Sequence, residues 1–146
     1  MENRIKIQDV QPAAWKAMYG LSNYLTHTDL SKLHLELIKI RASQINGCAF
    51  CIDIHTKDAL KNGETTQRIF LLNAWHDTDL FTDEEKTLLA MTEEITLISN
   101  DGLTTKTYNQ AKSYFSEEVI AQIIMAVVII NSWNRIAIST QMPEKI

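Results

Sequence analysis

One apolar segment near the end of the chain constrains the fold more than any other feature. Residues 119–138 include the run 123–130, which is mostly β-branched and on composition alone would favour a strand. A single strand of about twenty residues would be far longer than usual, however. Ser116, followed by two glutamates, supplies a helix N-cap and an acidic first turn. We therefore predict that this segment is a buried helix.

Apolar residues recur at helical spacing through the rest of the chain, and no segment alternates as a half-buried strand does. Pro12 suits the first turn of a helix, whereas the Asn-Gly pairs at 46–47 and 62–63 are typical stop signals. Thr82 and Glu85 have the spacing of a capping box. The prediction is an all-α, single-domain helical bundle of about six to seven helices that spans residues 1–146. The expected segments are an extended stretch over 1–11, helices over 12–25, 30–45, 47 or 48 to 61, and 65–75, a polar loop over 76–79, and helices over 82–99, 104–115 and 119–138.

Composition and charge narrow the function classes. A chain of 146 residues that is 45% hydrophobic can form one core without cross-links. The formal net charge is −4 and no basic run exceeds two residues, so we do not expect a nucleic-acid partner, because phosphate binding requires a concentrated basic surface. The run of eight apolar residues is shorter than the roughly twenty that a membrane-spanning helix needs. Because the N-terminus has no apolar stretch of signal-peptide length, we expect a cytoplasmic protein with no membrane partner.

The chemistry is concentrated in one short stretch, because both cysteines and one of the four histidines lie within eight residues. If this stretch is helical, Cys48, Cys51 and His55 follow one another at intervals of three and four residues and share one face. Two cysteines this close would constrain the unfolded chain very little, so their spacing indicates redox or metal chemistry. The positive N-terminal end of a helix and a nearby imidazolium both favour a thiolate.

Several roles fit this pattern. A Cys51 thiolate can attack a peroxide and become a sulfenic acid, which Cys48 can convert to a disulfide. Cys48 can instead be the exposed thiol that meets an external disulfide. The two cysteines with His55 and a carboxylate can also bind zinc, and the cysteines can be two small buried hydrophobes. The c-type haem attachment motif is absent, because Ile52 and not histidine follows Cys51.

Glu36 and residues 41–55, with the sequence RASQINGCAFCIDIH, resemble the active-site signature of the alkylhydroperoxidase D-like branch of the carboxymuconolactone decarboxylase family, small all-helical proteins. In that family a glutamate stands twelve residues before the first cysteine, which is the position of Glu36 in this chain. The resemblance implies Cys51 as the peroxidatic thiol, Cys48 as its partner, and His55 with Glu36 as a proton relay.

The resemblance also implies an activity. We expect a thiol-dependent alkylhydroperoxidase or disulfide oxidoreductase that cycles through a Cys48–Cys51 disulfide. It would take a small-molecule peroxide and a thiol or dithiol reductant or redox partner protein, and it would need no metal or organic cofactor. One departure is Phe50, since the best-known hydroperoxidases have a second histidine there. The alternatives are a redox-sensing or interaction module that uses the same disulfide, and a lyase of the carboxymuconolactone decarboxylase type.

Further residues carry weaker expectations. The predicted helices over 30–45 and 119–138 are apolar on more than one face, which predicts a homo-oligomer, and the resemblance implies a trimer or hexamer. Arg41 can pair with a carboxylate and Asn46 can cap the turn before Cys48, but a structural role is expected for each. The remaining aromatic candidates are Tyr19 and Tyr24 as walls of a pocket, and Trp15, Trp75 and Trp133 as core or subunit contacts.

Overall fold

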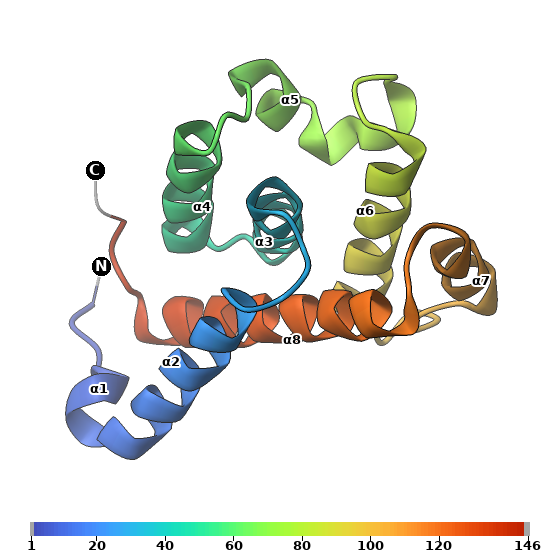
Figure 1. The fold of residues 1–146 in the computed structure, drawn as a ribbon. Coiled ribbons are helices and arrows are strands. Elements are labelled where there is room, and N and C mark those ends of the chain that lie inside the picture. The colour runs from blue at the N-terminus through green and yellow to red at the C-terminus, as the bar shows by residue number, and fades with distance from the viewer. Residues whose placement is uncertain (1, 145–146) are drawn as a thin grey trace.

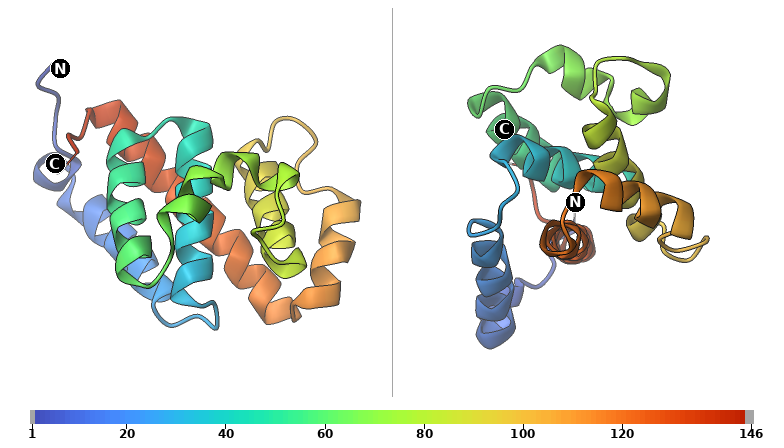
Figure 2. Two further views of the ribbon diagram at one scale, coloured as in Figure 1. Left: turned by 90° about the horizontal axis from the view of Figure 1, so that it is seen from above. Right: turned by 45° about the vertical axis from the view of Figure 1, so that its right-hand side comes forward.

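The computed structural model describes residues 2–144 and confirms an all-α fold, with no strand in that part of the chain. Helix α3 lies at the centre, with α4 and α6 on either side of it and α8 running across the fold (Figure 1). Helix α2 lies at one edge, away from α6 and α7 (Figure 2). The elements are α1 (Ile7–Val10), α2 (Pro12–Leu25), α3 (Lys32–Asn46), α4 (Ala49–Lys61), α5 (Thr66–Phe70), the 3₁₀ helix η1 (Leu72–Asp77), α6 (Asp83–Thr96), α7 (Thr105–Tyr114) and α8 (Glu117–Thr140).

The helix boundaries follow the capping signals in the sequence. At the start of five helices, a serine or threonine side chain accepts a hydrogen bond from the backbone amide three residues later. The capping box at Thr82 and Glu85 is confirmed, because each side chain bonds the other residue's backbone amide. Most predicted helices are therefore present, with ends shifted by a few residues. The five capping residues are Ser31, Thr65, Thr82, Thr104 and Ser116.

The prediction that residues 1–11 are extended is wrong in part, because residues 7–10 form the single turn α1. The backbone amides of Asp9 and Val10 both donate to the carbonyl of Lys6, at 3.1 and 3.2 Å. None of the residues of α1 is buried. One exposed turn leaves no apolar periodicity in the sequence, so the pattern could not reveal it.

The prediction of a single helix over 65–75 is also wrong, because the chain forms α5 and then the 3₁₀ helix η1. Leu71, between the two, has ψ of 2°, and Ala74 has non-helical φ and ψ of −116° and 28°. The break turns Trp75 into the core, where its Nε1 donates to Glu93 Oε1 at 2.7 Å. Residues 76 and 77, expected in a loop, complete η1.

The core forms where α3 packs against α4, α6 and α8. Large aliphatic side chains from α3 and α8 are fully buried there, and each contributes roughly 1.5–3 kcal/mol to stability. The apolar segment near the end of the chain is thus the buried helix that its capping signals predicted. The fully buried aliphatic residues of these two helices include Leu37, Ile38, Ile40, Ile123, Val127, Ile129 and Ile130.

Helix α8 also carries polar contacts inside the fold. Asn134 has no exposed surface, donates to Ser43 Oγ at 2.9 Å, and accepts from Asn46 Nδ2 at 2.8 Å. By length and composition alone α8 is apolar enough to cross a membrane. Within the fold it packs against α2, α3 and α6.

Candidate active site

A tight turn between α3 and α4 places the cysteine pair. Gly47 ends α3 in the left-handed conformation, with φ of 69°, as the Asn-Gly signal predicts. Cys48 is then the N-cap of α4, not part of the helix, and its backbone amide donates to the carbonyl of Ser43 at 3.0 Å. The backbone amide of Cys51 lies 3.3 Å from Cys48 Sγ. Both sulfurs therefore lie in the first turn of α4, where the helix dipole favours a thiolate after reduction.

Cys48 and Cys51 are joined in a disulfide, with their Cα atoms 5.4 Å apart. Both residues are buried, with exposed fractions of 1% and 3%. They differ in their surroundings, because Cys51 lines a cavity between α2, α4 and α8 and Cys48 does not. A molecule in that cavity therefore meets Cys51, and Cys48 lies behind it. In this oxidised state neither sulfur is free to bind a metal as a thiolate.

His55 lies one turn after Cys51 on α4 and is held by a carboxylate from α3. Its Nδ1 is 3.0 Å from Oε2 of Glu36, a residue only 6% exposed. The predicted contact between Glu36 and His55 across the Gly47 turn is thus confirmed, whereas their role as a proton relay stays a prediction. With Nδ1 donating to the carboxylate, Nε2 is the nitrogen left to exchange a proton with a ligand.

Lys39 extends the same polar cluster. Its Nζ lies 3.4 Å from Oε1 of Glu36, so the two oxygens of this carboxylate contact an ammonium and an imidazole. Glu36, His55 and Asp58 each have a potential ligand atom within 4.8 Å of the others. The Lys39 ammonium already provides a positive charge for Glu36, which weakens the case for a metal ion among these three residues.

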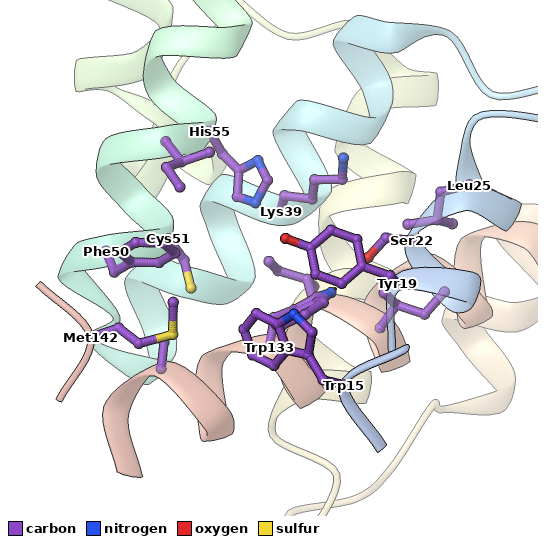
Figure 3. A pocket seen from close by; sticks show the side chains of 14 residues that line it. Trp15, Tyr19, Ser22, Leu25, Lys39, Phe50, Cys51, His55, Trp133 and Met142 are labelled. Carbon is purple, nitrogen blue, oxygen red and sulfur yellow. Dashed lines mark hydrogen bonds between the residues drawn. The ribbon is translucent and has the colours of Figure 1, made fainter. Parts of the chain in front are cut away.

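A cavity of about 340 Å³ lies between α2, α4 and α8, next to Cys51 and His55. Figure 3 shows Lys39, His55 and the hydroxyl of Tyr19 toward one end, and Phe50, Cys51 and Met142 toward the other. Its walls are mainly aromatic and aliphatic. The lining residues are Trp15, Tyr19, Ser22, Leu25, Lys39, Phe50, Cys51, Ile54, His55, Ile129, Ile130, Trp133, Ala137 and Met142.

Aromatic rings from α2 and α8 form one wall of this cavity. The Trp15 and Trp133 rings meet edge to face with centroids 5.2 Å apart, and Trp133 Nε1 donates to Ser22 Oγ at 2.8 Å. Tyr19 packs on both tryptophans and lines the cavity as the sequence suggested, whereas Tyr24 is not among the lining residues. The prediction that the three tryptophans are core or subunit contacts is confirmed for Trp75, which is buried, and for Trp133, which packs against the core while it also lines the cavity. Trp15 lines the cavity as well.

Sequence reasoning missed several lining residues. Lys39 stands three residues after Glu36 on α3, and helical spacing could have placed both on one face. Met142 lies beyond the end of α8, and only the path of the C-terminal segment brings it to the cavity. Trp15 and Trp133 are 118 positions apart in the sequence, so their contact depends on tertiary packing.

Two further residues of the signature have structural contacts. Arg41 Nε donates to Glu93 Oε1 at 2.9 Å, which confirms the predicted pairing with a carboxylate. Asn46 does not cap the turn before Cys48, and its contacts are structural, as expected. Its Nδ2 instead donates to Asn131 and Asn134 on α8, at 2.9 and 2.8 Å, because the end of α3 lies against that helix.

Comparisons with known proteins agree with this geometry. Residues 12–94 match the family model described as the carboxymuconolactone decarboxylase family. The chain is 41% identical over 139 residues to the uncharacterized protein YdfG of Bacillus subtilis strain 168, covering 95% of each chain.

Solved structures with a similar fold include proteins of related description. A protein of unknown function from Agrobacterium tumefaciens, proposed in its description to be the antioxidant defence protein AhpD, superposes with a TM-score of 0.95 at 35% identity over 99% of each chain. The debrominase Bmp8, solved as a cysteine-to-alanine variant in complex with 2,3,4-tribromopyrrole, superposes with a TM-score of 0.84 at 16% identity, over 94% of this chain and 74% of Bmp8. At that identity, the likeness to Bmp8 shows the fold alone.

Proposed function

This chain belongs to the carboxymuconolactone decarboxylase family, and we propose that within it the protein is a dithiol–disulfide oxidoreductase that reduces organic hydroperoxides. One observation carries the proposal. The Cys51 side of a Cys48–Cys51 disulfide borders a largely apolar cavity, beside a histidine that is hydrogen-bonded to a buried glutamate. The AhpD-like structural neighbour supports an antioxidant role of this kind.

The first half of the proposed cycle starts from the reduced dithiol. The Cys51 thiolate attacks the terminal oxygen of a hydroperoxide ROOH, the O–O bond breaks, and Cys51 becomes a sulfenic acid. The leaving alkoxide takes a proton and departs as the alcohol ROH. His55 is the proposed proton donor, through Nε2, while Glu36 holds Nδ1 and stabilises the imidazolium before transfer.

The second half regenerates the disulfide and then the dithiol. The Cys48 thiol attacks the sulfur of the sulfenic acid, a water molecule leaves, and the Cys48–Cys51 disulfide forms. An external thiol, dithiol or redox partner protein then reduces it by exchange. In sum, one hydroperoxide and two thiols give one alcohol, one water and one disulfide, so no metal or organic cofactor is required.

Turnover of a simple hydroperoxide tests this proposal. The wild-type protein should reduce tert-butyl hydroperoxide with dithiothreitol as reductant, and Cys51→Ser should abolish the reaction. Full activity in that variant would contradict the assignment. No turnover in the wild type, together with a large redox-dependent change in shape or assembly, would instead favour a sensor. Decarboxylation of a lactone that continues unchanged in Cys51→Ser would favour the lyase.

We also propose that the protein works as a homo-oligomer. Among the residues of α2, Leu25 alone is buried, although Leu21 and Tyr24 are also apolar or aromatic and remain exposed. Val128 and Ile138 on α8 are likewise exposed. A second copy could cover these surfaces. Light scattering at micromolar concentration should give a mass above one chain, and a monomer would contradict this proposal.

A further inference from the structure

The charges around the cavity suggest what kind of hydroperoxide it accepts. Among the described residues that line it, Lys39 carries the one permanent charge, His55 can add a second by protonation, and no carboxylate is present. Glu36 contacts both groups from behind the cavity wall. The carboxylates of Glu36 and Asp58 lie near His55 but are not among the residues that line the cavity, so Lys39 is the permanently cationic group that faces it.

Burial makes this charge more effective. The Lys39 side chain is 19% exposed, and a lysine in such a position is normally paired. Its ammonium can donate three hydrogen bonds, and Glu36 accepts one at 3.4 Å, which is longer than the roughly 2.7–3.2 Å typical of such bonds. An anionic group in the cavity could accept another. A charge-assisted hydrogen bond in a partly buried site is roughly twice as strong as a neutral one.

The rest of the cavity fits an apolar body. Trp15, Trp133, Phe50 and Met142 provide aromatic and thioether surfaces, which pack well against rings and alkyl groups. At about 340 Å³, the cavity lies within the roughly 300–1,000 Å³ range of sites for drug-sized ligands. Figure 3 shows Lys39 toward the end opposite Met142. The cavity thus combines an apolar surface with one cationic end.

We propose that the preferred substrate is an organic hydroperoxide with an apolar body and a carboxylate, and that Lys39 binds this carboxylate. The inference rests on the proposed hydroperoxide reduction and adds no chemical step to it. Lys39 is then a residue that determines specificity, and its contribution should appear mainly in KM for charged substrates.

A pair of substrates that differ in charge but share the same apolar body tests this inference. Cumene hydroperoxide with a para-carboxylate and the methyl ester of the same compound share the ring and the reacting group. The wild-type protein should prefer the carboxylate by roughly tenfold in kcat/KM, as expected for one charge-assisted contact. Lys39→Met should remove this preference, and Lys39→Arg should retain part of it. Lys32→Met removes the same charge from α3 outside this cavity and should leave the preference intact.

The outcomes separate the inference from the proposed function. If the wild type reduces both compounds equally well, or if Lys39→Met slows both by the same factor, the inference is wrong and hydroperoxide reduction stands. If the wild type reduces neither compound nor tert-butyl hydroperoxide, the proposed function fails as well. Should Lys39→Met not fold, the wild-type preference can be followed against salt concentration. It should fall as salt screens the ammonium, and a constant ratio would contradict the inference.

Discussion

Replacing Glu36 by glutamine tests the proposed proton relay of Glu36 and His55. The substitution keeps the shape of the side chain but removes the charge that His55 Nδ1 contacts at 3.0 Å. Both groups are shielded from solvent, with side-chain exposures of 8% for Glu36 and 18% for His55. A hydrogen bond to a charged group contributes about 1.5–3 kcal/mol in such surroundings. If it stabilises the protonated imidazole in the transition state, Glu36→Gln should slow the reaction by about 10- to 100-fold.

The rate of peroxide reduction by the pre-reduced protein measures this effect directly. Trp15 and Trp133 line the cavity together with Cys51, so stopped-flow tryptophan fluorescence should report oxidation of the thiol pair. Thermal unfolding of each variant should be measured alongside, because Glu36→Gln also leaves the Lys39 ammonium without its carboxylate.

Glu64→Gln is the matched control. Glu64 is also a buried glutamate, but it pairs with Arg68 at 2.8 Å and does not line the cavity. The thiol pair of the Glu64→Gln variant should be oxidised by peroxide at the wild-type rate. An unchanged rate in Glu36→Gln, or an equal loss in both variants, would refute the argument that Glu36 acts through His55.

Three further predictions follow from individual contacts. Cys48→Ser should react once with a hydroperoxide and stop as a sulfenic acid, which mass spectrometry should detect after dimedone trapping; repeated turnover would contradict the role of Cys48. Asn134→Leu should lower the free energy of unfolding in urea by about 2–4 kcal/mol, because Asn46 loses a buried partner, and a loss below about 1 kcal/mol would argue against that contact. Burial raises the pKa of Glu85, but hydrogen bonds from Arg68 and a backbone amide outweigh it and hold the pKa below its usual 4.5. The stabilisation that ionised Glu85 provides is therefore complete above pH 4.5 and is lost as the pH falls through the lower pKa of the folded state. The difference in unfolding free energy between wild type and Glu85→Gln should shrink on acidification. A constant difference would contradict the assigned pKa shift.

Much of the fold could be predicted from the sequence because its helices carry clear local signals. The Thr82 capping box and the Asn-Gly pair at 46–47 act through neighbouring backbone groups, so a short stretch of sequence is enough to locate them. The break after Phe70 could not be predicted in this way. It depends on Trp75 reaching Glu93 on α6, which is a tertiary contact.

The candidate site also combines residues that sequence spacing brings together with residues that only tertiary packing brings together. Cys48 is the N-cap of α4, Cys51 lies in its first turn and His55 one turn further on, so their spacing alone brings them together. Glu36 required either the structure or the family resemblance, because it lies on another helix. The aromatic wall and Met142 come from segments far apart in the sequence, and only their packing makes the cavity that borders Cys51.

The central claim is that the Cys48–Cys51 pair reduces a hydroperoxide. Its most direct test is the stoichiometry of a single turnover without added reductant. The fully reduced wild-type protein, mixed with excess cumene hydroperoxide, should lose both thiols, form one intramolecular disulfide per chain, and release one equivalent of cumyl alcohol. If both thiols remain titratable and no alcohol is formed, the account is contradicted.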